Sequence, residues 1–168
     1  MNRAYYSNPI RTFIDQDTNL ILGELAKNNQ FALEDLQRNS WIEEIRILKR
    51  ELNAFQSGYL IFEYTVPRIG DRIDCVFLYG GSIFLLEFKV GEEKYQRYAI
   101  DQVTDYALDL KNFHKESHTR KVIPILIATK AELIPFHGEF SYDGIFDVQL
   151  CTTCNLRERI EQIVEVHK

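Results

Sequence analysis

The sequence predicts a single α/β domain in which a mixed β-sheet is flanked by helices, and three observations lead to this prediction. The chain has 168 residues, of which 45% are hydrophobic and 12% aromatic, enough for one sizeable core. Helical periodicity gives way in the middle of the chain to three short runs rich in β-branched and aromatic residues. A later apolar run lies between two further helical segments. The predicted order is therefore α-α-β-β-β-α-β-β-α.

Two helices are expected before the first strand. Residues 17–27 form a short helical segment that stops at Asn28 and Asn29. From about Ala32 to Phe55 apolar residues recur every three or four positions, which is the spacing of an amphipathic helix. The members of this stripe are Leu33, Leu36, Trp41, Ile45, Leu48, Leu52 and Phe55.

Three strands are expected next, over residues 59–66, 72–79 and 82–90. They are separated by Pro67-Arg68-Ile69-Gly70 and by Gly80-Gly81, which are typical turn sequences. The three strands are therefore expected to form an antiparallel meander.

The second half of the chain supplies a helix, two strands and a closing helix. The helix covers about residues 98–114, with a core stripe of Ala99, Val103, Ala107 and Leu110. Residues 122–129 are almost continuously apolar, which is typical of a buried strand. Residues 144–151 are expected to form the fifth strand, and residues 156–166 the last helix.

Composition limits the functional classes. The formal net charge of −5 argues against a protein that coats nucleic acid by bulk electrostatics. Local basic clusters could still bind nucleic acid, but each is more often a solvated face. The three clusters are Arg46, Lys49 and Arg50; Lys89, Lys94 and Arg97; and Lys111, Lys115, Arg120 and Lys121. The first residues lack a secretory signal, no apolar stretch could cross a bilayer, and three cysteines fit a reducing compartment. We therefore expect a cytoplasmic protein with no membrane partner.

Acidic residues on the predicted meander form the candidate site. A two-residue turn at Gly80-Gly81 sets Tyr79 opposite Ser82, and it therefore sets Asp74 opposite Glu87. If residues 67–70 form a four-residue loop, Glu63 is opposite Asp74. The three acids would then lie in one row across three strands, unless they are only the solvated face of a hairpin.

A row of acids on apolar strands is costly unless a positive charge neutralises it, and a divalent cation bound by oxygen atoms is the natural candidate. Lys89 is two residues after Glu87, so it lies on the same strand face. Two acids and a lysine around a cation can hydrolyse a phosphodiester bond. The cation activates a water, and the ammonium stabilises the charge that develops.

At this point the sequence resembles the PD-(D/E)XK nuclease superfamily, because Asp74 and Glu87-Phe88-Lys89 are on adjacent strands between helices. The resemblance implies a restriction-endonuclease-like core. It implies that Asp74, Glu87 and the backbone carbonyl of Phe88 hold Mg²⁺ or Mn²⁺, and that Lys89 is the catalytic lysine. Residues 102–106, Gln-Val-Thr-Asp-Tyr, also match the Gln-hydrophobic-x-x-Tyr motif of the RecB-like branch. One departure is Ile73, where the motif has proline.

A narrower resemblance links residues 63–68, 72–74 and 101–107, together with Ala4-Tyr5-Tyr6-Ser7, to the nuclease-like N-terminal region of bacterial Schlafen-type helicases. It spans almost the whole chain, and residues 1–168 are expected to form a single nuclease-like domain. No Gly-x-x-x-x-Gly-Lys-Ser/Thr phosphate loop occurs, so the ATP-driven motor is absent. The chain is therefore expected to be either a fragment or a stand-alone relative of a larger nuclease-helicase.

Further residues extend the candidate site. Gln102 and Tyr106 are one helical turn apart, where the glutamine could orient a water or a phosphate. Without the resemblance, a polar pair at the edge of the core is an equally good interpretation. Glu44 shares a helical face with Trp41 and is the additional acid we favour, with Glu43 as its solvent-facing alternative. Glu63 is expected to bind the metal directly or through water.

Other motifs are weaker. Cys151 and Cys154 have a Cys-x-x-Cys spacing, but an iron–sulfur cluster takes four cysteines and only Cys75 remains, so structural cysteines are expected. His114 and His118 lie where the predicted helix ends, and two histidines alone rarely make a zinc site. An acidic stripe is expected to face solvent, and it consists of Asp101, Asp105 and Asp109.

The sequence therefore predicts a Mg²⁺- or Mn²⁺-dependent nuclease that hydrolyses phosphodiester bonds, of DNA rather than RNA. The alternative is a catalytically silent nuclease-like module that binds nucleic acid or a protein partner. A third possibility is an accessory domain that acts only when joined to a helicase domain or subunit. The overall acidity favours this third version, since the partner would then supply most of the grip on the strand.

Overall fold

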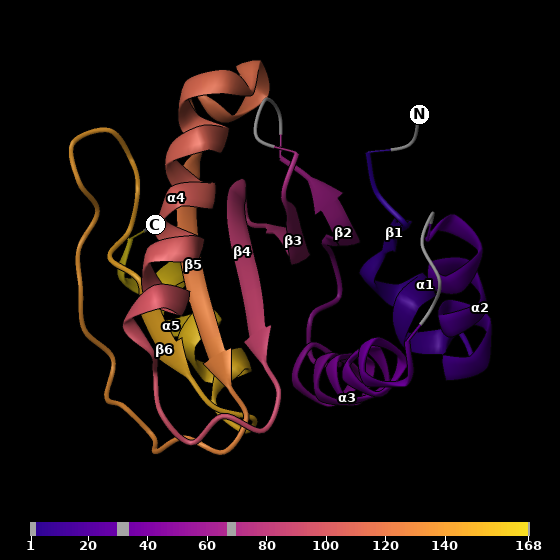
Figure 1. Cartoon of the computed structure of the whole chain (residues 1–168). Helices are drawn as coiled ribbons and strands as arrows, with labels where there is room; N and C mark the ends of the chain where they lie inside the picture. Colours follow the sequence, from indigo (N-terminus) through magenta and orange to yellow (C-terminus); the bar gives the residue numbers. More distant parts are fainter. Residues whose placement is uncertain (1–2, 30–33, 67–69, 168) are drawn as a thin grey trace.

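The computed structural model describes residues 3–29, 34–66 and 70–167, and Figure 1 shows a sheet with helices on both sides. The elements in chain order are β1 (Tyr6–Pro9), α1 (Ile10–Asp15), α2 (Thr18–Asn28), α3 (Asp35–Glu51), β2 (Tyr59–Thr65), β3 (Arg72–Tyr79), β4 (Ser82–Lys89), α4 (Arg97–Phe113), the 3₁₀ helix η1 (Lys115–Ser117), β5 (Lys121–Ala128), β6 (Gln149–Cys151) and α5 (Leu156–Val166). The α/β class predicted from the sequence is confirmed.

The described strands form one mixed sheet of six strands in the order β1-β2-β3-β4-β5-β6. Strands β1 to β4 pair antiparallel, whereas β5 and β6 are each parallel to their preceding neighbour. A parallel pair needs a crossover connection, and α4 supplies it between β4 and β5. The predicted antiparallel meander is therefore β2-β3-β4, and it lies inside a larger sheet.

The β3–β4 hairpin has the register that the sequence predicts. Gly80 and Gly81 have φ angles of 60° and 78°, which is the left-handed pair that a type I′ turn requires. Tyr79 is therefore opposite Ser82, and the ladder continues until Cys75 is opposite Leu86.

The β2–β3 hairpin also has the predicted register, with Tyr59 opposite Leu78 and Thr65 opposite Arg72. The Val66 N–H donates to the Asp71 carbonyl at 2.8 Å, which extends the same register by one pair. Three residues of the predicted four-residue loop, 67–69, lie outside the described residues.

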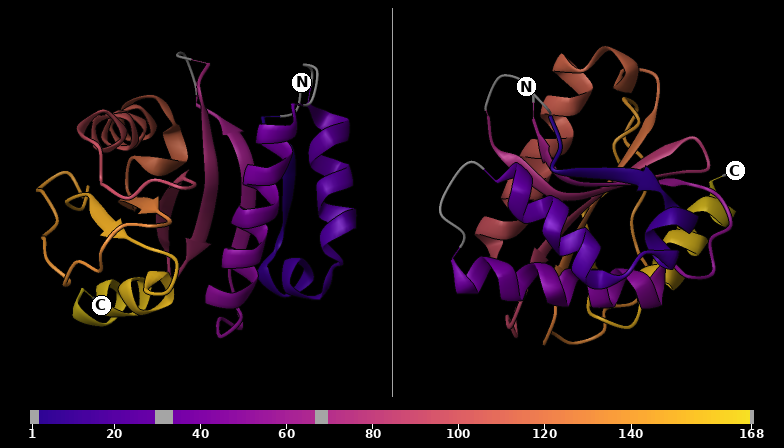
Figure 2. Two further views of the ribbon diagram at one scale, coloured as in Figure 1. Left: turned by 60° about the horizontal axis from the view of Figure 1, so that its bottom comes forward. Right: turned by 90° about the vertical axis from the view of Figure 1, so that its right-hand side faces the viewer.

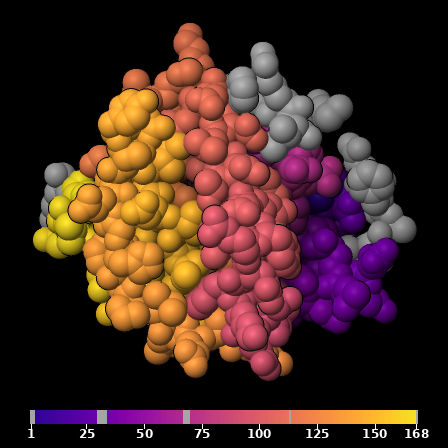
Figure 3. Space-filling view, turned by 60° about the vertical axis from the view of Figure 1, so that its left-hand side comes forward, coloured from indigo at the N-terminus to yellow at the C-terminus, as the bar shows by residue number. Residues whose placement is uncertain are grey.

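Helices cover both faces of the sheet, and the left view of Figure 2 shows α1, α2 and α3 on the side opposite α4. The first face carries a core that includes Trp41, Phe62 and Phe77, together with side chains from α5. On the second face α4 contributes Val103, Ala107 and Leu110 of its predicted stripe, and Ala99, the remaining member, is also buried. Figure 3 shows the outer side of α4, flanked by the orange segment that follows β5. The sheet is consequently buried on both sides.

Helix α3 is joined to the C-terminal part of the chain by a buried carboxylate. Glu51, its last residue, accepts hydrogen bonds from the backbone N–H groups of Leu156 at 3.0 Å and Arg157 at 3.3 Å. These groups belong to the first turn of α5, where an anion is stabilised by the free N–H groups and by the helix dipole. The contact fixes α5 against the same face as α3.

The structure adds two elements at the N-terminus and shortens one strand. Strand β1 and helix α1 were not predicted, and they are anchored by Tyr6, Ile10 and Phe13, all buried. Of the predicted strand over residues 144–151, only β6 (Gln149–Cys151) is a continuous strand. Gly144 has a φ of 86°, and Ile145 makes only an isolated bridge to Val122. The helix predicted over residues 32–55 is α3, which ends at Glu51, and residues 32 and 33 lie outside the described residues.

Candidate functional site

The candidate site lies where β3 separates from β4. The β2–β3 ladder continues to Thr65–Arg72, but the β3–β4 ladder ends at Cys75–Leu86. The next residues, Asp74 and Glu87, therefore lie at the point where the strands diverge. Beyond it β4 remains paired only with β5, up to Lys89 opposite Ala128. Because β3 and β4 are not paired beyond this point, side chains from the two faces of the sheet can contact one another here.

Asp74 and Glu87 are in contact across the separated strands. The backbone N–H of Phe88 donates to Asp74 Oδ2 at 2.8 Å, and the Asp74 N–H lies 3.4 Å from Glu87 Oε1. Burial, and then repulsion from Glu87, raises the pKa of Asp74 well above its ordinary value. Burial also raises the pKa of Glu87, although Lys89 and hydrogen bonds to Asp74 oppose the shift. Two carboxyl groups this close favour holding one proton between them.

Glu63 joins this pair from β2. Its φ of 53° is the left-handed value that side chains other than glycine rarely adopt, and the β2–β3 ladder is interrupted at this residue. Its carboxylate accepts a 3.0 Å hydrogen bond from the indole Nε1 of Trp41. Burial, and then repulsion from Asp74, raises the pKa of Glu63 to about 7, against the lowering effects of Trp41 and Arg72. Glu63 and Asp74 therefore lie together, as the register predicts, but without a regular ladder pair.

Glu44 reaches the same cluster from α3. It is only 3% exposed, and burial together with repulsion from Asp74, Glu63 and Glu87 raises its pKa well above the ordinary value. Its neighbour Glu43 forms an ion pair with Arg46 at the surface. Of the two acids considered from the sequence, Glu44 is the one beside the other three.

Lys89 is held at the edge of the acids by α4. Its ammonium donates to Gln102 Oε1 at 3.1 Å and lies 3.6 Å from Glu87 Oε2. The Gln102 amide in turn donates to the hydroxyl of Tyr106 at 2.9 Å. The sequence predicted the proximity of Gln102 and Tyr106 to the Lys89 strand, and the hydrogen bonds fix the orientation of the lysine.

A second cation lies at the outer side of the cluster. The Arg72 guanidinium is 4.6 Å from the ring centre of Tyr5 and lowers the pKa of Glu63. Its Nε has no hydrogen-bond partner among the described residues. Four carboxyl groups, buried in Glu44 and Glu87 and half-buried in Glu63 and Asp74, thus face two basic side chains, which leaves an excess of acid in a region with little water to solvate it.

Phe88 and the other predicted metal ligands do not form a ready-made site. Phe88 lies between Glu87 and Lys89, opposite Ile127 of β5. Over residues 3–29, 34–66 and 70–167, no group of three or more His, Cys, Asp or Glu side chains is arranged to hold a metal ion. The acids are gathered, but their oxygen atoms do not converge on one point.

The weaker motifs have structural roles. Cys75 and Cys151 are buried and Cys154 is exposed, all of them as free thiols, which agrees with the structural interpretation. His114 Nδ1 contacts Ser117 Oγ at 2.8 Å, in the turn after α4. The predicted acidic stripe on α4 faces outward, with Asp101 and Asp105 exposed.

The basic clusters are used mainly in intramolecular contacts. Lys49 donates to the carbonyls at the end of α1, those of Phe13 at 2.8 Å and Ile14 at 3.0 Å. Lys111 donates to the carbonyls of His118 and Arg120. These lysines stabilise the fold and are not free to grip a phosphate backbone.

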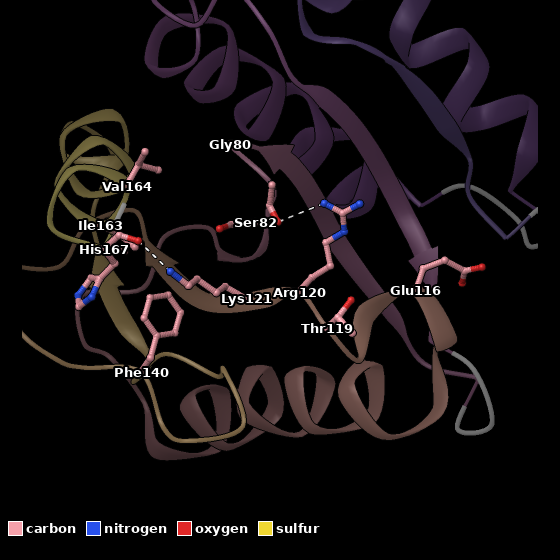
Figure 4. Close-up of a pocket in the computed structure, with 11 residues that line it drawn as sticks. Gly80, Ser82, Glu116, Thr119, Arg120, Lys121, Phe140, Ile163, Val164 and His167 are labelled. Atoms are coloured by element: carbon pink, nitrogen blue, oxygen red, sulfur yellow. Dashed lines mark hydrogen bonds between the residues drawn. The ribbon is translucent and has the colours of Figure 1, made fainter.

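A cavity of about 610 Å³ lies at the other end of the sheet, beside the Gly80-Gly81 turn. Figure 4 shows Lys121 pointing towards His167 and Phe140. The Lys121 ammonium donates to the His167 carbonyl at 2.8 Å and lies 5.1 Å from the ring centre of Phe140. A cation at the C-terminal end of α5 complements the helix dipole, so Lys121 has a structural role there.

No described helix has the length and apolar character needed to span a membrane. Comparisons with protein-family models, curated proteins and solved structures found no match to the chain.

Proposed function

We propose that the chain is a divalent-metal-dependent nuclease that hydrolyses phosphodiester bonds, of DNA rather than RNA. One observation carries the proposal: four carboxyl groups from four separate elements, of which Glu44 and Glu87 are buried and Glu63 and Asp74 half-buried, meet beside a lysine that α4 holds in place. The resemblance to the PD-(D/E)XK superfamily adds support, because its motif residues are the ones that come together. In this proposal the meander and its helices are a restriction-endonuclease-like core of the RecB-like branch.

The donor set fits Mg²⁺ or Mn²⁺ in its chemistry. Both ions prefer oxygen ligands, and carboxylates whose pKa is raised by burial and by neighbouring acids are the groups whose charge a cation would offset. Asp74, Glu87, Glu63 and the Phe88 carbonyl would hold the ion, with Glu44 as an additional acid. Bound there, it would supply Lewis-acid activation of a water and of a phosphate oxygen.

Lys89 is the electrostatic catalyst in this proposal. Its hydrogen bond to Gln102 and its 3.6 Å contact with Glu87 hold the ammonium at the edge of the acids. A phosphate placed there lies beside the lysine ammonium, whose position is already fixed. The site therefore needs no reorganisation when negative charge develops on the phosphate oxygen atoms. Hydrolysis adds water across one P–O bond and leaves a phosphate monoester and a hydroxyl group.

Gln102 positions Lys89, since its carbonyl oxygen accepts from the lysine while its amide donates to Tyr106. The glutamine orientation is therefore fixed at both ends. Its amide is the group that would orient a water or a phosphate oxygen beside the lysine.

A catalytically silent module that binds nucleic acid or a protein is the second candidate. The observation that favours it is the lack of a preassembled group of three metal-ligating side chains among the described residues. An accessory role beside a helicase domain or subunit is compatible with either candidate. The net charge of −5 supports such a role, because the partner would supply most of the electrostatic contacts to the nucleic acid strand.

The deciding experiment incubates labelled single- and double-stranded DNA and RNA with the protein and Mg²⁺, Mn²⁺ or EDTA. We expect metal-dependent cleavage by wild type and none by Lys89→Ala. Lys115→Ala, which alters an exposed lysine in η1, is the matched control and should cut normally. Cleavage that persists in EDTA or in Lys89→Ala would indicate a contaminant and refute the assignment.

Calorimetric titration with Mn²⁺ separates the two roles at the site. Lys89 is not a ligand in this scheme, so Lys89→Ala should bind Mn²⁺ with near-normal affinity while Asp74→Ala binds it much more weakly. An equal loss of affinity in both variants would show that the roles are wrongly assigned.

A further inference from the structure

An exposed aromatic ring stands next to the lysine of the proposed site. Tyr98, in the first turn of α4, is 59% exposed, and its ring centre lies 5.5 Å from Lys89 Nζ. A tyrosine exposed to this degree contributes little to the core. Its ring face therefore has room for a ligand that also contacts the lysine.

Tyr98 belongs to a row of side chains along one face of α4. Residues four apart on a helix are neighbours, so Tyr98 is followed along this face by Gln102 and then by Tyr106. Gln102 and Tyr106 are hydrogen-bonded to each other, and Lys89 contacts both Gln102 and the Tyr98 ring. Tyr106 is buried, so Tyr98 is the member of this row that offers a ring to solvent.

Because the chain is acidic, a nucleic acid strand bound at this site would need contacts other than ion pairs. The net charge is −5, and Lys49, Lys111 and Lys121 donate to backbone carbonyls within the fold. Arg97, beside Tyr98, is paired with Asp101 at 3.2 Å. A nucleic acid strand held here would gain little from phosphate contacts alone, whereas stacking of a base on an aromatic ring does not depend on net charge.

We propose that Tyr98 is a base-stacking subsite, which holds the nucleobase next to the phosphate bound at Lys89 and thereby requires that base to be unpaired. This inference rests on the proposed nuclease function and adds a substrate requirement to it. Successive bases of a strand are about 3.4 Å apart along its axis. A ring 5.5 Å from the ammonium is thus within one or two nucleotides of the bound phosphate.

The stacking requirement selects the form of the substrate. Inside a duplex both faces of a base are covered by its neighbours, so no face is free for Tyr98 without unstacking that costs a few kcal/mol. A single strand offers these faces at much lower cost. Discrimination therefore comes from Tyr98 and not from the acids, which in the proposed function would hold the metal ion and contact no base.

The first test measures binding without metal, so that no cleavage occurs. A five-nucleotide single strand with one 2-aminopurine is titrated in EDTA with wild type, Tyr98→Ala, Tyr98→Phe and the control Tyr142→Ala. Tyr142 is fully exposed but lies in the segment beside Val122, about 20 Å along β5 from the Lys89 end. We expect wild type, Tyr98→Phe and Tyr142→Ala to quench the fluorescence with similar affinity. Tyr98→Ala should bind about 5- to 150-fold more weakly.

The second test follows cleavage in Mn²⁺ of a single strand and of the same strand with one abasic residue beside the cleaved bond. Tyr98→Ala should reduce cleavage of the intact strand, but it should have no further effect on the abasic strand, which has no base to stack. If Tyr98 only supports Lys89, the loss is equal on both strands, and the inference is overturned.

The two proposals can fail separately. Wild type that quenches the fluorescence through Tyr98 but cuts no substrate supports the stacking subsite and refutes the nuclease. Wild type that cuts a blunt duplex as fast as a single strand, with Tyr98→Ala unchanged, supports the nuclease and refutes the subsite. A single strand that wild type does not bind refutes the subsite in either case.

Discussion

Glu63 should make the metal-free protein less stable as pH rises, and the structure allows the size of this effect to be worked out. Its pKa is raised from an ordinary 4.5 to about 7 by burial and by Asp74. The folded state therefore holds its proton more tightly than the unfolded state. The stability that this proton contributes is fully present below pH 4.5 and is lost as pH rises through about 7.

The expected loss from Glu63 alone is about 2.5 kcal/mol between pH 5 and pH 8. For a chain of this length it corresponds to a fall in Tm of roughly 5–10 °C. Glu63→Gln keeps the side-chain shape and the oxygen that accepts from Trp41, but it cannot ionise. The variant should lose about 2.5 kcal/mol less than wild type over the same range.

The assay is thermal and urea unfolding in EDTA at pH 5, 6, 7 and 8 and constant ionic strength. Glu43→Gln is the matched control, because Glu43 is on the same side of the molecule but is paired with Arg46, which lowers its pKa. Removing Glu43 should not flatten the pH profile. If wild type and Glu63→Gln lose the same stability from pH 5 to pH 8, Glu63 is not a buried acid under repulsion, and the excess charge inferred for the cluster is wrong.

Two further predictions follow from the same geometry. Asp74→Asn keeps an oxygen for the Phe88 N–H and removes a charge facing Glu87, so in EDTA at pH 8 the variant should have a Tm at or above that of wild type. Mn²⁺ at ten times its dissociation constant should stabilise wild type by about 1.4 kcal/mol, which raises its Tm by roughly 3–5 °C. The same Mn²⁺ concentration should stabilise Asp74→Asn by much less. A much lower Tm in the variant and an equal gain from Mn²⁺ would make Asp74 a structural ion-pair partner. With a thiol reagent, Cys154 alone should react quickly and Cys75 and Cys151 only on unfolding, so three fast thiols would contradict their burial.

The hairpin registers could be predicted because local chemistry determines them. Gly80 and Gly81 adopt the two left-handed conformations of a tight turn at low cost, and such a turn leaves only one register. Apolar periodicity likewise located α3 and α4, since each buries a stripe against the sheet.

Strand β1 could not be predicted, because its four residues, Tyr6-Ser7-Asn8-Pro9, have no strand pattern of their own. Asparagine and proline are uncommon in strands, and this segment becomes one only by pairing with β2 at the edge of the sheet. Residues 144–148 show the opposite case. Their apolar content resembles a strand, but Gly144 and the contact of Phe140 with Phe146 turn them into a loop with isolated bridges.

The residues of the candidate site could be predicted in part, but the strand geometry that brings them together differs from the predicted regular alternation. Strict alternation would put Ile73 and Cys75 on one face of β3, yet Cys75 is in the core beneath α3 whereas Ile73 packs under α4. The alternation changes at Asp74, opposite the left-handed Glu63. The acids therefore meet at a local break in the sheet and not in a flat row. The sequence indicates Trp41, which holds Glu63, only as a core residue, and Tyr98 only as the start of the predicted helix over residues 98–114.

The cost of this arrangement is itself an argument for a cation. A left-handed Glu63 costs about 1–3 kcal/mol, and burial raises the pKa of all four carboxyl groups, which adds to the cost. A hairpin with only a structural purpose would be more stable with glutamine or leucine at these positions. Features that oppose folding persist where the surrounding structure holds them and where they serve a function. Here α3, β2, β3 and β4 each bring an acid to one place, and in the proposed function a divalent cation bound among them would offset their repulsion.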